Sequence, residues 1–156
     1  MSENQPLVIH GWNIFAHSLG LNQFEELRTQ VEHLRQKYPQ DYKKKNATKR
    51  LAAIAKLAFD VIPQDPTRSD YRQGTTLGDE YKHWFRAKFF QQYRLFFRYH
   101  QESKIIVFAW VNDENSKRAY FKKMLESGNP PDNWNDLLKD AQGETNRLEK
   151  AVNVEI

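Results

Sequence analysis

The chain has 156 residues, and its 10 Phe, 7 Tyr and 4 Trp supply large apolar side chains for one folded core. It contains no cysteine, which excludes disulfides, thiolate nucleophiles and zinc–cysteine sites. The net charge of +4 is modest but unevenly spread: residues 42–59 carry six basic groups, and residues 82–104 have a net charge of +5. Such clustering is the electrostatic footprint of nucleic-acid binding, although a solvated basic helix or a docking surface for an acidic protein looks similar.

The first part of the chain predicts one strand and two helices. Leu7–Phe15 reads as the strand, and Asn22 is a suitable N-cap for a helix that ends before Pro39. A second helix is expected from about Asp41 to Val61. Each helix has an apolar residue every three or four positions, which predicts one buried stripe: Phe24, Leu27, Val31, Leu34 and Tyr38 in the first, and Ala47, Leu51, Ile54, Ala58 and Ile62 in the second.

Residues 63–81 hold two Pro and two Gly and read mainly as loop. The next thirty residues alternate basic and aromatic side chains, with polar breaks near Gln91 and near Glu102, and predict three strands joined as hairpins. Side chains alternate between the two faces of a strand. One face is therefore expected to be apolar and the other to carry arginines.

The last part predicts a helix from about Ala119 to Leu125, then a short one from Asn133 to Asp140 with Asp132 as its cap. The sequence after Gly143 is polar and is expected to fray. We thus expect one domain, residues 1–143, with a polar tail, 144–156. The element order indicates an α+β fold in which two helices cover one face of a small sheet and the arginine face stays open.

No Walker loop, dinucleotide fingerprint or metal-ligand spacing is found in the sequence, so neither a cofactor nor a metal is expected. No apolar run approaches the length of a membrane span, and the N-terminus lacks the basic start and apolar stretch of a signal peptide. We expect a cytoplasmic protein without a membrane partner.

Two long stretches, YKKKNATKRLAAIAKLAFDVIPQDPTRSDYRQGTTLGDEYKHWFRAKFFQQYRLFFRYH and KIIVFAWVNDENSKRAY, closely resemble the YhaV toxins, a family of the RelE-like superfamily of bacterial toxin–antitoxin systems. The resemblance runs from about His10 to Leu138. It departs from the family pattern at one place. YhaV-like chains carry an extra stretch after the KRAY tetrapeptide, whereas here Tyr120 is followed directly by FKKMLESGNPP.

The resemblance implies a RelE-like fold, with an N-terminal strand and two helices packed on a small antiparallel sheet and with C-terminal helices. It implies a metal-independent endoribonuclease that acts on mRNA in association with the ribosome. It also implies neutralisation by a PrlF-like antitoxin, and contact with operator DNA mainly through the toxin–antitoxin complex.

Metal-free RNA cleavage requires an aligned 2′-hydroxyl, stabilisation of the charge on the phosphorane, and proton transfers. Guanidinium groups suit the second task, because they stay charged and donate in a planar fork to phosphate oxygens. Arg86 and Arg94 are the candidates, on neighbouring strands of the arginine face; alternatively they are surface arginines paired with carboxylates. Tyr120 or His83 is the candidate for proton transfer.

Further basic residues are candidates for holding the RNA backbone: Lys88 and Arg98 on the strands, Lys117 and Arg118 after the last strand, and Lys44, Lys45, Lys49 and Arg50 on the second helix. Two other interpretations remain open. The chain is either a catalytically inactive RNA- or ribosome-binding module, or a degenerate toxin that acts mainly by binding its antitoxin.

Overall fold

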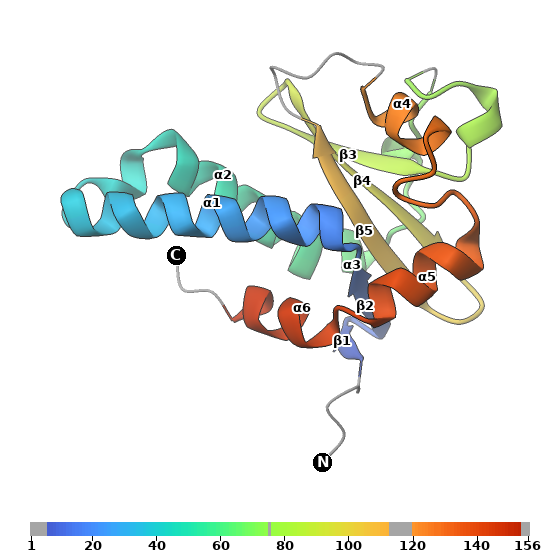
Figure 1. Cartoon of the computed structure of the whole chain (residues 1–156), viewed down its shortest axis with the longest axis horizontal. Coiled ribbons are helices and arrows are strands. Elements are labelled where there is room, and N and C mark those ends of the chain that lie inside the picture. Colours follow the sequence, from blue (N-terminus) through green and yellow to red (C-terminus); the bar gives the residue numbers. More distant parts are fainter. Residues whose placement is uncertain (1–5, 75, 113–119, 154–156) are drawn as a thin grey trace.

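The computed structural model describes residues 6–74, 76–112 and 120–153. A five-stranded sheet in the order β1-β2-β5-β4-β3 lies at its centre, and helices cover parts of both faces (Figure 1). The strands are β1 Leu7–Ile9, β2 Trp12–Ala16, β3 Phe85–Phe89, β4 Tyr93–His100 and β5 Ile105–Asn112. The protein is therefore α+β, with an architecture compatible with a RelE-like fold.

The N-terminal strand differs from the expectation in two ways. It is split into β1 and β2 by a tight turn in which His10 and Gly11 adopt φ angles of +51° and +83°. In addition, β2 pairs with β5 in parallel, so the sheet is mixed rather than antiparallel. A parallel pair needs a long crossover connection, and the helices between β2 and β5 belong to it.

The first face of the sheet carries the two predicted helices. They are α1, Ser18–Lys37, and α2, Asn46–Lys56, which continues through a π-helical segment, Leu57–Val61, into α3, Ile62–Gln64. The stripe prediction is confirmed for most positions, with Leu51 and Ile62 fully buried, but it is wrong for Tyr38, which follows the last residue of α1 and is exposed. The N-cap prediction is wrong: α1 begins one turn before Asn22, where the Nδ1 atom of His17 accepts a hydrogen bond from the Leu19 amide (3.2 Å).

A glycine sets the distance between α1 and the sheet. A β-carbon added at Gly20 would lie 2.9 Å from the carbonyl oxygen of Ala109 in β5, closer than side-chain carbons approach backbone. The first turns of α1 consequently lie directly against the β5 backbone. This close approach also fixes where the later residues of α1 stand relative to the end of β5.

The opposite face is not open, contrary to the expectation. It carries α4, Tyr120–Glu126, α5, Trp134–Gln142, and the segment 76–84, which enclose a second core (Figure 1). The Phe96 ring of β4 stacks on Phe121 of α4, with 4.5 Å between centroids, and Trp84 meets the same ring edge-on at 5.1 Å. Burial of these three rings gives α4 its place on the sheet, and only part of the arginine face remains uncovered.

The polar tail is another difference. Residues Thr145–Val152 form helix α6, which packs on α1 and β2 with Leu148 and Ala151 buried. The Arg147 guanidinium donates to both carboxylate oxygens of Glu25 in α1, at 2.6 and 3.1 Å. That hydrogen-bonded pair lowers the pKa of Glu25. The expectation of a fraying tail is wrong for this helix because its apolar positions recur at helical spacing among the charges.

Replacing Leu148 by Ala tests whether α6 belongs to the core. The side chain is 2% exposed, so its removal leaves a cavity and should cost about 2–5 kcal/mol of unfolding free energy. Urea denaturation measures the loss. Glu149→Ala, at the neighbouring exposed position, is the control and should change stability little. Equal stability of the two variants would show that α6 is dispensable for the fold.

Candidate functional site

Two rows of side chains cross β3, β4 and β5 at the end of the arginine face that α4 and α5 leave uncovered. In the first row Arg86 pairs with Phe96, which pairs with Trp110. In the next row Lys88 pairs with Arg94, which pairs with Asn112. Arg86 and Arg94 are therefore diagonal neighbours on one face, at the separation that long side chains bridge. We call these two residues the arginine pair.

Both residues of the arginine pair are half-buried, and their positive charges are incompletely balanced by their surroundings. The Nε atoms of Arg86 and Arg94 are both buried, and neither has a hydrogen-bond partner among the residues that the structure describes. Burial, and next the charge of Arg94, lower the pKa of Arg86. Within residues 6–74, 76–112 and 120–153, no carboxylate forms an ion pair with either guanidinium. An anion such as phosphate, placed between two like charges with unused Nε donors, would satisfy donors and charge together.

Aromatic side chains border the arginine pair. Tyr120, the first residue of α4, is 46% exposed, and its ring lies 6.1 Å from that of Trp110. Trp110 completes the row of Arg86 and Phe96, so the phenol of Tyr120 stands at the same end of the face. The Nε1 atom of Trp110 is buried, and the described part of the chain offers it no hydrogen-bond partner. The structure thus places Tyr120 beside this surface.

His83 belongs to a different cluster. Its Nε2 atom lies 2.6 Å from the Oδ1 atom of Asp132, which also accepts from the Trp84 indole at 2.8 Å. Burial raises the pKa of Asp132, but the hydrogen bonds from His83 and Trp84 outweigh it and the net pKa is lowered. Asp132 therefore ties the start of β3 to the segment before α5. It does not cap α5, whose N-cap is the side chain of Asn133.

Arg98 has the same neighbours. Its guanidinium carbon lies 5.5 Å from the ring of Trp84 and 5.2 Å from that of Trp134, and its Nη1 atom donates to the Asp132 carbonyl at 2.5 Å. Burial lowers its pKa, and the charge of Asp132 offsets part of that effect. Phe96 lies between Arg98 and Arg94 on β4. Arg98 is therefore held in the packing of α5, away from the arginine pair.

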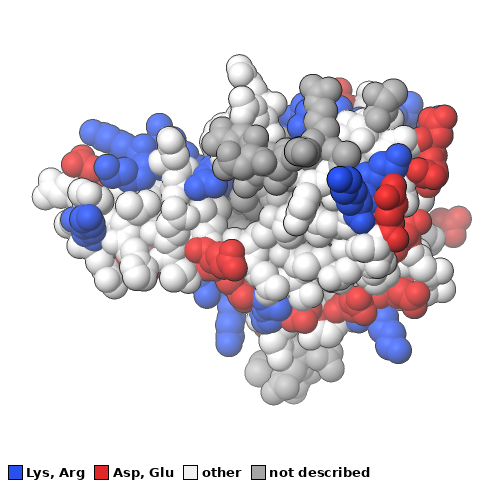
Figure 2. Space-filling model, turned by 45° about the horizontal axis from the view of Figure 1, so that its top comes forward, with Lys and Arg blue, Asp and Glu red and all other residues white. Residues whose placement is uncertain are grey.

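The basic residues predicted on the second helix are distributed over Tyr42–Lys44, a 3-10 turn, and α2. Lys45 lies over the ring of Tyr38 at 4.3 Å, and Arg50 lies over that of Tyr93 at 5.8 Å. Lys44 is within 3.8 Å of Asp41, and Lys49 is exposed. In Figure 2 basic side chains gather over the part of the molecule formed by α1 and α2. We call residues 43–50 the basic helix surface.

The remaining predicted basic residues are Lys88, Lys117 and Arg118. Lys88 is exposed on β3, next to Arg94. Lys117 and Arg118 lie outside the described residues, as does the KRA part of the tetrapeptide before Tyr120. Sequence reasoning missed Trp110 and Asn112. Strict alternation along β5 would put both on the other face, but the pairing shifts between Phe97–Phe108 and Phe96–Trp110, and this irregularity brings them into the two rows. In the described part of the chain, no three His, Asp or Glu side chains are arranged to hold a metal ion.

Comparison with protein-family models matches residues 14–142 to the YhaV toxin family, described as a toxin with endonuclease activity of a toxin–antitoxin system. This chain belongs to the YhaV toxin family. It is therefore a toxin of a toxin–antitoxin system with endonuclease activity. Among curated proteins, the ribonuclease toxin YhaV of Escherichia coli strain K12 is 37% identical over 148 residues, which cover 88% of this chain and 96% of that protein.

The YhaV toxin of E. coli O157:H7 has the same identity and coverage. No solved structure shows a significant similarity to this chain. No helix in the described part of this YhaV-family chain is both long and apolar enough to cross a membrane.

The role of Asp132 is tested by Asp132→Asn. The variant should lose about 1 kcal/mol near neutral pH, because it weakens hydrogen bonds to a half-exposed carboxylate. Because the pKa of Asp132 is lower in the folded than in the unfolded protein, its carboxylate stabilises the fold at any pH above the ordinary aspartate pKa. This stabilisation is lost as the pH falls through the pKa of the folded state. The difference in thermal unfolding temperature between wild type and variant should therefore disappear below about pH 4. Asp136→Asn is the control on α5, and a gap independent of pH would contradict the assignment.

Proposed function

We propose that this chain is an endoribonuclease that cleaves mRNA without a metal ion and that the arginine pair holds the scissile phosphate. The observation that carries the proposal is the pair itself: two half-buried guanidiniums on one face, with buried Nε donors unused and no carboxylate paired with them among the described residues. The name of the E. coli K12 relative, ribonuclease toxin YhaV, supports RNA as the substrate. The family membership supports the nuclease activity.

The proposed reaction is an attack by the 2′-hydroxyl of the RNA on its own phosphate. The 2′-oxygen of one nucleotide attacks the neighbouring phosphorus, a bond to it forms, and the bond from phosphorus to the 5′-oxygen breaks. The products are a 2′,3′-cyclic phosphate and a 5′-hydroxyl. Negative charge grows on the non-bridging oxygens in the transition state, where fixed guanidinium donors stabilise it more than in the ground state.

Proton transfer is assigned to Tyr120. The 2′-hydroxyl loses a proton and the leaving 5′-oxygen gains one, so a group with a transferable proton is needed near the phosphate. The exposed phenol of Tyr120 lies against Trp110, in the row that Arg86 begins. His83, the other sequence candidate, already has Asp132 as its partner at 2.6 Å, which favours a structural role for it.

The remaining basic groups are proposed to guide RNA to the arginine pair. Lys88 is exposed in the same row as Arg94, and the basic helix surface lies on the other side of the sheet end. Lys117 and Arg118 precede Tyr120 in the sequence and are proposed to hold the same backbone. Contacts of this kind position RNA without reading its sequence and weaken with salt. Arg98 is left out because its neighbours are Trp84, Trp134 and Asp132.

The partners are proposed from the family. We expect a PrlF-like antitoxin that covers the toxin, association with the ribosome in the cytoplasm, and contact with operator DNA mainly through the toxin–antitoxin complex. An acidic antitoxin would suit the basic helix surface, because its charge is the opposite of that surface.

Arg94→Ala and Arg94→Lys test the site. Loss of a phosphate-stabilising group should slow cleavage about 100- to 1,000-fold, and Lys should restore little because it cannot donate in a planar fork. Cleavage of mRNA is measured in EDTA with and without ribosomes. Lys139→Ala, on the exposed surface of α5, is the control. An Arg94→Ala protein as active as the parent would overturn the assignment.

The alternative function is RNA or ribosome binding without cleavage. It is favoured by one observation, the direct passage from Tyr120 into α4 where the family pattern has an extra stretch. In that case RNA binding should weaken with salt, while no cleaved product appears under any condition above. Growth arrest on induced expression, relieved by the neighbouring gene, would favour the nuclease.

A further inference from the structure

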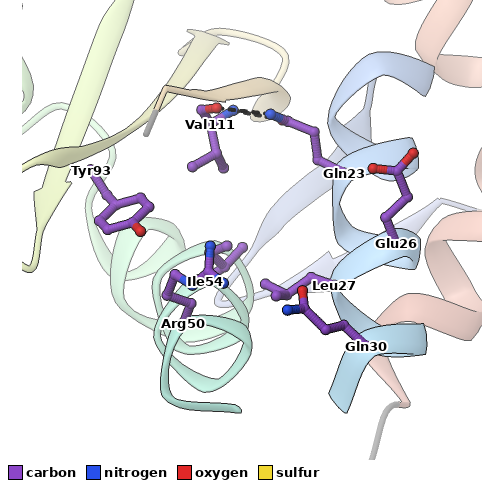
Figure 3. A pocket seen from close by; sticks show the side chains of 8 residues that line it. All are labelled: Gln23, Glu26, Leu27, Gln30, Arg50, Ile54, Tyr93 and Val111. Atoms are coloured by element: carbon purple, nitrogen blue, oxygen red, sulfur yellow. Dashed lines mark hydrogen bonds between the residues drawn. The ribbon is translucent and has the colours of Figure 1, made fainter. Parts of the chain in front are cut away.

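A cavity lies where α1 and α2 meet the end of β4 and β5, on the face opposite the arginine pair. Its volume is about 200 Å³, and Figure 3 shows the lining side chains Gln23, Glu26, Leu27, Gln30, Arg50, Ile54, Tyr93 and Val111. Pockets for drug-sized ligands have about 300–1,000 Å³. The cavity therefore fits one flat group, such as a nucleobase, rather than a larger cofactor.

One side chain fixes the shape of this cavity. Gln23 donates from Nε2 to the Val111 carbonyl and accepts at Oε1 from the Val111 amide, both at 2.8 Å (Figure 3). Its amide group thus pairs with the β5 backbone as a neighbouring strand would. Together with the close approach at Gly20, this clamp holds α1 at a set distance from the sheet. The space between them is preformed.

Two solvent-exposed polar side chains form the α1 side of the cavity. Glu26 and Gln30 stand one turn apart on α1, and among the described residues neither side chain has a hydrogen-bond or ion-pair partner. On the opposite side stand Arg50 and Tyr93, and Phe89 stacks on the ring of Tyr93 with 5.2 Å between centroids. Leu27 and Ile54 add apolar surface. A carboxylate, an amide and a guanidinium therefore surround one small space.

We propose that this cavity binds a guanine base of the RNA substrate, an inference that rests on the proposed function. The Watson–Crick edge of guanine presents two adjacent donors, N1–H and the N2 amino group, and the Glu26 carboxylate accepts both. The O6 atom beside them accepts from Gln30, and the guanidinium of Arg50 provides a plane for stacking. Adenine presents an acceptor at N1, which the carboxylate cannot satisfy.

The position of the cavity suits an RNA chain that also reaches the arginine pair. Tyr93 and Arg94 are consecutive, and their side chains point to opposite faces of β4, which begins at Tyr93. An RNA strand that passes over this end of the sheet meets both the cavity and the arginine pair. The basic helix surface contributes positive charge beside the cavity. An apolar anchor from a protein partner fits less well, because it would bury Glu26 and Gln30 without hydrogen-bond partners.

Short RNA oligonucleotides that differ in one position, guanine or inosine, test the proposal. Inosine lacks only the N2 amino group, so it removes one of the two hydrogen bonds to Glu26. Fluorescence anisotropy with the Arg94→Ala protein measures binding without turnover, and cleavage by the protein with Arg94 intact is measured in parallel. We expect the guanine RNA to bind about five- to tenfold more tightly than the inosine RNA.

Adding Glu26→Gln should abolish that preference, whereas Glu32→Gln, at an exposed position further along α1, should keep it. Equal binding of the two RNAs, with cleavage intact, would overturn the guanine site and leave the proposed function standing. Absence of cleavage with the preference intact would overturn the nuclease and keep the guanine site. A Glu26→Gln protein that keeps the preference and loses antitoxin binding would identify a protein-docking cavity and also overturn the proposal.

Discussion

The antiparallel register of β3, β4 and β5 is the constraint from which the rest of the site follows. It sets Arg86 opposite Phe96 and Lys88 opposite Arg94, so that two guanidiniums come to lie diagonally on one face. A one-residue slip would send the same side chains into the opposite core. The register is fixed because the apolar residues on that other face, Leu95 and Phe97 among them, are fully or nearly buried.

The C-terminal helices decide how much of the arginine face can meet a substrate. Phe121 of α4 stacks on Phe96, and Asp132 binds the side chains of His83 and Trp84. Arg98 is enclosed in that cover, whereas the arginine pair lies beyond it. The aromatic packing therefore covers most of the basic face and leaves a site at one end of the strands. The two positive charges of the arginine pair lie at this end. Two positive charges at one place favour binding of a single phosphate over contacts along a long RNA backbone.

The sequence predicted the elements well where a single periodicity decided them. The helical stripe through Leu51 and Ile62 and the three-stranded segment are confirmed, because burial of one face governs both patterns. What failed depended on contacts between distant segments. The second core could not be read from Phe96 alone, since its partner Phe121 lies in another element. The helix after Gly143 was missed because its many charged residues suggested an exposed tail. One of these residues, Arg147, in fact pairs with Glu25 of α1.

The arginine pair and the guanine cavity share the end of β4, which explains why the two sites can act on one molecule. The Gln23 clamp and the approach at Gly20 fix α1 against β5, while register fixes the arginines. Neither site depends on the other for its shape. Binding a base in a rigid cavity would position the adjoining phosphate before reaction, and this lowers the entropic part of the barrier.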